Sequence, residues 1–484
     1  MTPSENACKA CDACNASDAC IGYHNKVCGH CQYSLYEELE AYTRRGIYPF
    51  HMPGHKGNAR FLPPVSWAAL DVTELENTDN LHDPTGCIKE TKRRIANLCG
   101  ADESFLLING STSGIIAAIM ATCDDGDVIA VDRNCHRSVY SGMVLSGAYP
   151  AYFWPGGLGF SEKARAVIVT SPTYEGNVLD IKKVAESAHR QGAILIVDEA
   201  HGAHFPLHEI FPKNALSQGA DIVITSFHKT LPAFSQSAAV HVQGSRVNIG
   251  RLRQALSMIQ TSSPSYLIMA ATDYMLNKLQ SEKSHFEEYV ENLLALRKDI
   301  GNFLIPTDDI SKLLINATNG RELEHEFKIA FELVTNCNQL AITTVADTKE
   351  GFDRLKVALG QKGVKGTSPL AGRLCAGGTR LAVSGSELCA SGTRLVVSGS
   401  DFGAEPQGLD LPEIVLSPKE SLNKKNKKTK TSKLSESIGE VSGGFIAPFP
   451  PGIPLLAPGE RITESLVRNL ADSFADCEIE ILLL

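Results

Sequence analysis

AILIVDEAHGAH (residues 193–204) and DIVITSFHKTLPA (residues 221–233) are the two stretches from which the fold can be predicted. Each begins with a run of apolar, mostly β-branched residues, which is typical of a buried strand in a parallel sheet. The first run ends in Asp198, and Lys229 follows the end of the second. Because ligands bind at the carboxyl ends of the strands of open α/β sheets, we expect this acid and this amine at one edge of one sheet.

An acid and a lysine at such an edge are the groups by which proteins control pyridoxal phosphate, since the acid holds the pyridinium nitrogen and the lysine forms a Schiff base. A buried carboxylate such as Asp198 is costly unless it is paired, and the pyridinium would supply the pair. Lys229 must lose its proton to act as a nucleophile, and desolvation lowers the pKa of a lysine. The alternative interpretation is that Asp198 caps a helix and that Lys229 is an exposed amine.

A strand, turn and helix upstream predict a phosphate site. The apolar run 105–108 is followed by NGSTSG (residues 109–114) and then at once by an apolar helix. Free N–H groups and the helix dipole favour an anion at such a helix start, so we expect Ser111, Thr112 and Ser113 to hold a phosphate. The turn is not a P-loop, because no Gly-Lys-Ser/Thr follows. An ordinary N-cap, which needs only one Ser or Thr, is the alternative.

The region from 105 to 245 alternates predicted strands with predicted helices, which indicates a mainly parallel, doubly wound sheet. His136 follows another strand end of this pattern. An imidazole there could stack on a flat ring, and a structural histidine is the alternative. The acidic, turn-rich segment 71–86 is too polar for a core and suits a loop at the mouth of a site.

Composition excludes several classes of protein. The 484 residues are 43% apolar and 21% charged, which is typical of a globular chain with two or three domains. The net charge of −9 gives no electrostatic footprint for nucleic acid, so we expect no such partner. No apolar run reaches the roughly 18 residues needed to span a membrane. The absence of a signal peptide and the fourteen cysteines favour a reducing cytoplasm.

The segment 1–32 carries six of those cysteines, Cys8, Cys11, Cys14, Cys20, Cys28 and Cys31. Two-residue spacings allow neighbouring thiolates to bind one metal, as in structural zinc sites. Its Lys, Asp, Asn and Ala content favours instead a disordered tail with reduced thiols. We interpret the segment as an appendage and keep zinc binding as the alternative.

Residues 373–437 interrupt the globular pattern. They contain a tandem 14-residue repeat, RLCAGGTRLAVSGS (373–386) and ELCASGTRLVVSGS (387–400), followed by a lysine-rich run. Two copies are too few for a repeat fold to bury a core, and a run of like charges is usually solvated. We therefore predict a low-complexity insert over 373–437.

Several motifs together resemble one family. They are FHMPGHKG, DVTELENTDNLHDPTG, NGSTSG, DRNCHRS, SPTYEG, VDEAHGAH, SFHKTLPA and PFPPGIPLLAPGERI, in this order over roughly 35–370 and 438–484. This pattern is similar to that of the bacterial Orn/Lys/Arg decarboxylases, in a short form without the N-terminal wing domain. The resemblance implies a pyridoxal-phosphate enzyme of the aminotransferase-like fold type I. It implies a large domain over 33–304 with a mainly parallel seven-stranded, doubly wound sheet, and a small α+β C-terminal domain over 305–372 and 438–484.

The resemblance also implies roles for individual residues. Lys229 corresponds to the Schiff-base lysine, with His228 beside it at the cofactor. Asp198 would pair with the pyridinium nitrogen and His136 would stack on the ring, while Asp79 and Glu460 would line the substrate side. The rest of the cofactor-binding set would be Ser111, Thr112, Ser113, His201 and Ser226.

The implied activity is decarboxylation of a basic amino acid in polyamine metabolism. Arginine to agmatine is our first expectation, followed by lysine to cadaverine and ornithine to putrescine. A homodimer or higher homo-oligomer with a shared active site is expected. Two alternatives are a pyridoxal-phosphate-dependent aminotransferase and a non-catalytic metal- or nucleic-acid-binding protein.

Overall fold

The computed structural model describes residues 39, 42–64, 66–75, 77–154, 164–317, 320–335, 338–362, 411–423, 428–447, 452–474 and 477–483. The predicted cysteine segment 1–32 and the repeat at 373–400 lie outside these residues. The chain divides into two units between Tyr48 and Pro49, later than the boundary at residue 33 that we expected, and the larger unit is Pro49–Leu484. Among the described helices, none is both long and apolar enough to cross a membrane.

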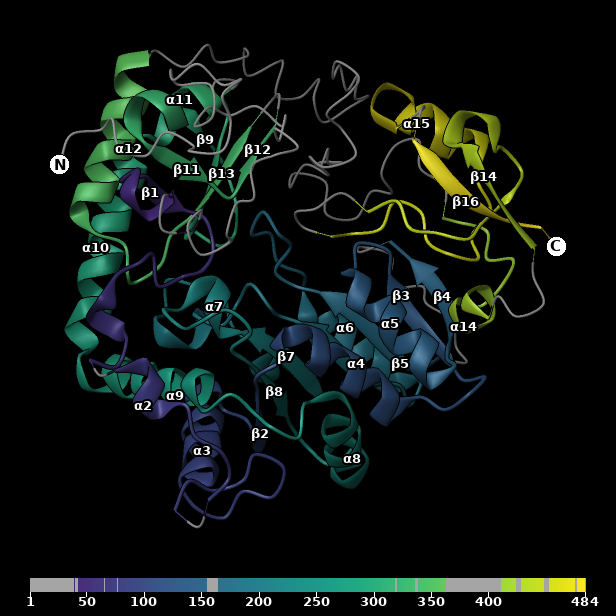
Figure 1. The fold of residues 1–484 in the computed structure, drawn as a ribbon, viewed down its shortest axis with the longest axis horizontal. Helices are drawn as coiled ribbons and strands as arrows, with labels where there is room; N and C mark the ends of the chain where they lie inside the picture. The colour runs from purple at the N-terminus through teal and green to yellow at the C-terminus, as the bar shows by residue number, and fades with distance from the viewer. Residues whose placement is uncertain are drawn as a thin grey trace, which may run out of the picture. The chain divides into compact units, whose positions relative to one another are not determined.

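A seven-stranded sheet is the centre of the large domain, as predicted (Figure 1). Its strand order is β2-β8-β7-β6-β5-β3-β4, and only β8 runs antiparallel to its neighbours. The strands are β2 (Glu103–Leu107), β3 (Val128–Asp132), β4 (Tyr149–Phe153), β5 (Ala164–Thr170), β6 (Ile194–Asp198), β7 (Ile222–Ser226) and β8 (Ala238–Val242).

Helices cover both faces of this sheet, because its central strands are apolar on both sides. In β6, Ile194 and Ile196 pack into one core, whereas Leu195 and Val197 pack into the other. The first core is covered by α4 (Gly110–Thr122), α5 (Arg137–Ser146) and α8 (Ile249–Ile259), and the second by α6 (Ile181–Arg190). Figure 1 shows α4 and α5 lying over the strands. Alternate residues of one strand thus enter different cores, which is the physical basis of the doubly wound fold.

The large domain has five further α-helices among the described residues. They are α2 (Trp67–Leu70), α3 (Cys87–Cys99), α7 (Phe227–Thr230), α9 (Tyr266–Ser281) and α10 (Lys283–Asp299). The four-residue α7 begins directly after β7 and carries Lys229. The register of the parallel strands pairs Thr170 with Asp198 and Asp198 with Ile224, so β5 and β6 end side by side and β7 continues two residues further, to Ser226.

A smaller α+β unit follows, and its first strand begins at Leu304. Its four-stranded antiparallel sheet has the order β12-β13-β10-β9, and α11 and α12 accompany it. These elements are β9 (Leu304–Ile305), β10 (Lys312–Ile315), α11 (Gly320–Phe327), β12 (Leu333–Val334), β13 (Gln339–Ile342) and α12 (Lys349–Lys362). Two short strands, β1 (Tyr48–Phe50) and β11 (Ile329–Phe331), lie outside this sheet.

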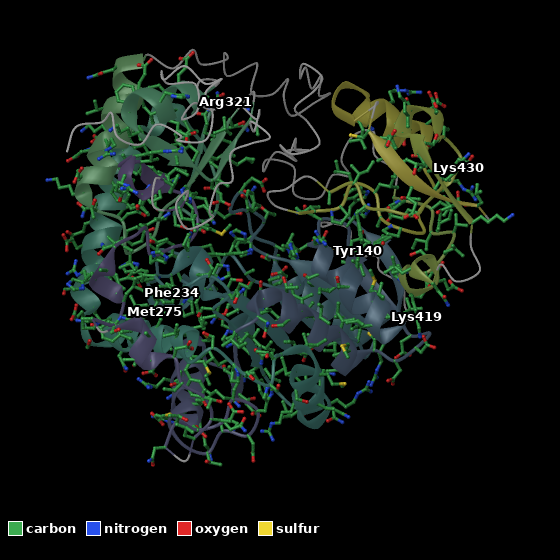
Figure 2. The ribbon with its side chains drawn as sticks, in the orientation of Figure 1. Tyr140, Phe234, Met275, Arg321, Lys419 and Lys430 are labelled. Carbon is green, nitrogen blue, oxygen red and sulfur yellow. The ribbon has the colours of Figure 1, made fainter. Side chains whose placement is uncertain are left out.

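The end of the predicted insert is folded, which corrects our boundary at 437. Lys428–Lys433 forms β14 and pairs antiparallel with β16 (Glu478–Leu483), whose other neighbour is β15 (Val441–Ser442). The lysine-rich run was predicted to be part of a solvated insert, but its end forms β14. As an edge strand, β14 needs only backbone pairing and tolerates exposed lysines. Lys430, which Figure 2 labels, is on this strand and makes an ion pair with Glu440.

The C-terminal segment therefore forms its own small body instead of completing the sheet of 304–342. The helices α14 (Pro418–Leu422) and α15 (Glu464–Phe474) accompany the three strands. The segment has a separate apolar core, to which Leu434, Ile462 and Ile481 belong. Leu434 precedes residue 438, so the folded C-terminal body includes residues that we had assigned to the insert.

Candidate active site

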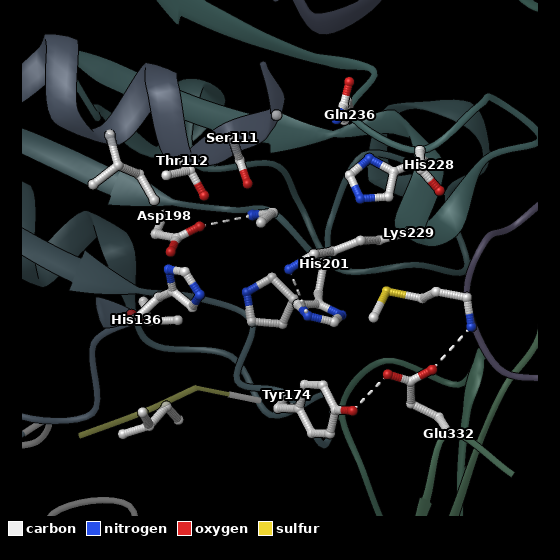
Figure 3. A pocket seen from close by; sticks show the side chains of 18 of the residues that line it. Ser111, Thr112, His136, Tyr174, Asp198, His201, His228, Lys229, Gln236 and Glu332 are labelled. Carbon is white, nitrogen blue, oxygen red and sulfur yellow. Dashed lines mark hydrogen bonds between the residues drawn. The ribbon is translucent and has the colours of Figure 1, made fainter. Parts of the chain in front are cut away.

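A cavity of about 530 Å³ opens at the carboxyl edge of the seven-stranded sheet (Figure 3). This volume is typical of a site for a small ligand or cofactor. The predicted residues that line it are Ser111, Thr112, His136, Asp198, His201, His228 and Lys229. They come from the starts of α4 and α5, from the end of β6 and from α7, which the parallel sheet aligns at one edge.

Lys229 and Asp198 both face this cavity, on neighbouring elements. The Lys229 Nζ lies 3.1 Å from His201 Nε2. Burial lowers the pKa of Lys229, against the opposing influence of Asp198 and Glu332. The amine therefore loses its proton more readily than an exposed lysine, as a nucleophile requires.

Asp198 is a buried acid in need of a cationic partner. Its side chain is only 4% exposed, and within the described residues its carboxylate accepts one hydrogen bond, from Ala200 N at 3.1 Å. Burial raises the pKa of Asp198, while Lys229 opposes the rise. A carboxylate that is desolvated, nearly unpaired and open to a cavity fits a protonated ring nitrogen, and this observation supports the fit of pyridoxal phosphate.

The predicted phosphate site is formed by the start of α4, with a change in its members. Ser111 and Thr112 line the cavity together with Ser235 and Gln236, which precede β8 and which sequence reasoning missed. Ser113 does not line the cavity. Its buried hydroxyl donates to Gly110 O at 2.7 Å instead. The expected phosphate contact of Ser113 is thus replaced by a bond inside the first helical turn.

Ser226 is buried behind the lining. Its Oγ has no hydrogen-bond partner among the described residues. A buried hydroxyl without a partner is rare in proteins and marks a place where a ligand atom could bind. Its predicted phosphate contact stays a prediction.

Two further histidines of the cavity wall, His136 and His228, are neutral and are held in place by hydrogen bonds. His136 is the N-cap of α5, and its Nδ1 accepts from Ser138 N at 3.2 Å. The Nδ1 of His228 donates to Ser237 O at 3.0 Å. Burial lowers the pKa of each imidazole to about 4, with Lys229 as a further cause. His136 is both a cap and part of the cavity wall, so the structural and the ring-stacking interpretations are compatible.

Glu332 is the acid in the cavity wall that sequence reasoning missed. One carboxylate oxygen accepts from Tyr174 OH at 2.6 Å and the other from Met52 N at 2.9 Å (Figure 3). Both Glu332 and Tyr174 line the cavity. The only signal in the sequence was a single acid inside an otherwise apolar run, IAFELV at 329–334.

Asp79 and Glu460, the predicted substrate acids, do not line this cavity. Asp79 accepts hydrogen bonds from the backbone N–H groups of residues 80, 85, 86 and 88, so it stabilises the turn before α3. Glu460 is 2% exposed and makes an ion pair with Arg133 at 3.2 Å. Neither predicted substrate acid lies at this cavity: Asp79 accepts from backbone N–H groups and Glu460 pairs with Arg133, while Glu460 Oε1 has no hydrogen-bond partner among the described residues.

The Arg133 and Glu460 pair connects the large domain to the C-terminal segment. Arg133 also donates to the carbonyl oxygens of Pro454 and Leu455 at 2.7 and 3.2 Å. Glu460 accepts in addition from Ala457 N at 2.8 Å. The segment 454–460 is thus anchored beside β3 through one buried guanidinium.

No group of three or more metal-binding side chains occurs in the part of the chain that the structure describes. The cysteines proposed for zinc lie outside it.

Two family profiles match the chain. The one described as Orn/Lys/Arg decarboxylase, major domain, matches residues 34–160 and 159–372. The one described as Orn/Lys/Arg decarboxylase, C-terminal domain, matches residues 405–472. The second match begins within the predicted insert, in agreement with the folded strand β14.

Named relatives cover nearly the whole chain. The uncharacterized protein YaaO of Bacillus subtilis is 31% identical over 463 residues, which are 90% of this chain and 93% of that protein. An arginine decarboxylase of the same organism is 30% identical over 483 residues, with coverage of 90% and 92%. The crystal structure of the Francisella novicida lysine decarboxylase LdcF has a TM-score of 0.66 at 19% identity, covering 89% of this chain and 78% of that one. This last likeness shows the fold alone.

Proposed function

We propose that this chain, which belongs to the Orn/Lys/Arg decarboxylase family of pyridoxal-phosphate-dependent carboxy-lyases, removes the α-carboxylate of arginine and releases agmatine and CO2. The observation that carries the proposal is one cavity that contains Lys229, Asp198 and Glu332. The first two suit the cofactor. The third supplies a negative charge for the far end of a basic amino acid.

Pyridoxal phosphate, when bound, supplies an electron sink for the breaking Cα–carboxylate bond. Lys229 would bond the cofactor aldehyde, and Asp198 would hold a proton on the ring nitrogen. Ser111 and Thr112 would bind the phosphate at the start of α4, where the helix dipole favours an anion. The neutral ring of His136 would lie against the cofactor ring, since burial prevents it from carrying a competing charge.

Glu332 is the candidate for recognition of the substrate side chain. Its carboxylate already accepts from Tyr174 and Met52, and each oxygen retains a lone pair for a second donor. A planar guanidinium matches a carboxylate with two parallel hydrogen bonds, whereas an ammonium offers a point charge. This geometric match and the arginine decarboxylases among the relatives support arginine over lysine or ornithine.

Product analysis with arginine, lysine and ornithine offered together tests the proposal. We expect agmatine and an equivalent amount of CO2, and Lys229→Ala should form neither. Cadaverine or putrescine as the main product would overturn the choice of arginine. A keto acid without CO2 would indicate an aminotransferase instead.

A homodimer in the cytoplasm is part of the proposal. The family resemblance implies a site shared between two subunits, and the described cysteines Cys87, Cys99, Cys123, Cys135 and Cys477 are free thiols, as in a reducing compartment. Sedimentation equilibrium should give a mass of about two chains of 52.2 kDa. A monomer with full activity would contradict the shared site.

A further inference from the structure

His201 lies between two buried lysines from distant parts of the chain. Its Nε2 is 3.1 Å from Lys229 Nζ, and its Nδ1 is 3.0 Å from Lys312 Nζ. His201 follows β6, Lys229 is in α7, and Lys312 begins β10 of the smaller sheet. His201 and Lys229 line the cavity, whereas Lys312 is fully buried and stands behind the imidazole.

The numbers of donors and acceptors restrict the protonation states of these three groups. A neutral imidazole has one N–H donor and one lone pair, an ammonium has only donors, and a neutral amine can accept. Two ammonium groups cannot both be satisfied by one neutral imidazole, because one of them would face an N–H. If Lys312 donates to Nδ1, then Nε2 carries the proton and donates to the lone pair of Lys229.

We propose that Lys312 is a positioning residue that, through His201, holds Lys229 as a free amine facing the cofactor site. This inference rests on the proposed function, in which Lys229 bonds the cofactor aldehyde. A charged Lys312 selects the tautomer of His201 with the proton on Nε2, and that N–H is satisfied only while Lys229 is unprotonated. Lys229 would then be unprotonated, and so reactive, whenever it is not bonded to the cofactor.

The acids that favour the charged form differ between the two lysines: Asp309 and Glu332 act on Lys312, whereas Asp198 and Glu332 act on Lys229. Burial lowers the pKa of Lys312 to about 8, with Asp309 and Glu332 opposing, so it is largely charged at pH 7. Burial lowers the pKa of His201 well below its usual range, and both lysines add to this effect. Among the acids, Asp198 raises the pKa of Lys229 most, and the ring nitrogen of the bound cofactor would pair with Asp198. The titratable groups that act on the three residues are Asp198, Asp309, Glu332, His136, His228 and Lys56.

Competitive acetylation of the full-length protein freed of cofactor tests the proposal. Acetic anhydride modifies only the free amine, and peptide mass spectrometry follows the modification of Lys229 against pH. Lys312→Met should raise the apparent pKa of Lys229 by about one unit, so that modification near pH 7 falls roughly tenfold. Lys312→Arg, which keeps a charged donor, should retain most of the wild-type profile.

Lys56→Met is the matched control. Lys56 is another buried lysine, but its Nζ donates to the carbonyl oxygens of His51 and Ile342 and makes no contact with His201. Lys56 acts on Lys312 and is not among the groups that act on Lys229, so its removal should leave the profile of Lys229 nearly unchanged. An unchanged profile in folded Lys312→Met would overturn the proposal.

The tautomer of His201 in the wild-type protein gives a second measurement that needs no folded variant at position 312. Nitrogen NMR of the ¹⁵N-histidine-labelled protein should show the proton on Nε2, with the signal assigned by its loss in His201→Gln. A proton on Nδ1 would overturn the proposal. Neither measurement depends on turnover, so a wrong substrate or reaction would show in the product analysis while these results stand.

Discussion

Replacing Glu332 by Gln is the sharpest test of how the cavity recognises a basic side chain. The substitution removes the charge that faces the substrate and keeps the size of the side chain. It also disturbs the local bonding. The carboxylate accepts from both Tyr174 OH and Met52 N, but an amide has only one oxygen, so its NH2 must face one of these donors.

The expected magnitude follows from these contacts. A hydrogen bond to a charged group contributes about 1.5–3 kcal/mol, and the amide retains one acceptor for the guanidinium. We therefore expect a loss of about 2–3 kcal/mol in transition-state binding, which corresponds to a fall of roughly 30- to 150-fold in kcat/KM for arginine. Absorbance of the bound cofactor should be unchanged, because Glu332 is not assigned to cofactor binding.

Steady-state kinetics with arginine, in parallel with Tyr174→Phe, provides the assay. Tyr174→Phe removes one donor to Glu332 but keeps the negative charge. We expect a smaller effect, about 1 kcal/mol or roughly fivefold in kcat/KM. If Glu332→Gln and wild type have the same kcat/KM, or if Tyr174→Phe is the more damaged variant, the assignment of Glu332 to the substrate is wrong.

Three further predictions concern the cofactor, the domain contact and pH. Lys229→Ala should abolish the visible absorbance of the bound cofactor while circular dichroism stays unchanged, and retained absorbance would exclude Lys229 as the bonding amine. Arg133→Met should lower the free energy of unfolding by about 3–5 kcal/mol, because it leaves the carboxylate of Glu460 buried without its partner. Denaturant unfolding measures this loss. The double variant Arg133→Met/Glu460→Gln, which removes the buried charge as well, should regain part of the lost free energy of unfolding. The stability of the cofactor-free protein should fall as the pH drops from 6.5 to 4, since His136 and His228 have pKa values of about 4 when folded and nearer 6.5 when unfolded. The unfolded chain binds these protons first, so each histidine costs up to about 3 kcal/mol by pH 4. His228→Gln should flatten this slope in urea titrations, and an equal slope would contradict the burial effect.

The number of strands, seven, was implied only by the family resemblance. The sequence by itself determined the mainly parallel, doubly wound sheet and the pair Asp198 and Lys229. Both follow from local information, because a β-branched run predicts a buried strand and the polar residue after it must lie at the carboxyl edge. The helix start with Ser111 and Thr112 could be predicted for the same reason, since the turn and the free N–H groups of the first helical residues are contiguous in the chain. These predictions needed no knowledge of distant contacts.

Only the tertiary structure decided which acids and amines serve the cavity. Glu332 lies 103 positions after Lys229 and 158 after Tyr174, and Lys312 lies 111 after His201, so no local pattern links them. Asp79 and Glu460 looked available in the sequence, but Asp79 accepts from backbone N–H groups and one oxygen of Glu460 pairs with Arg133, away from the cavity. A sequence shows where charged groups occur, but packing determines which of them are already paired, and only an acid open to the cavity can bind a substrate.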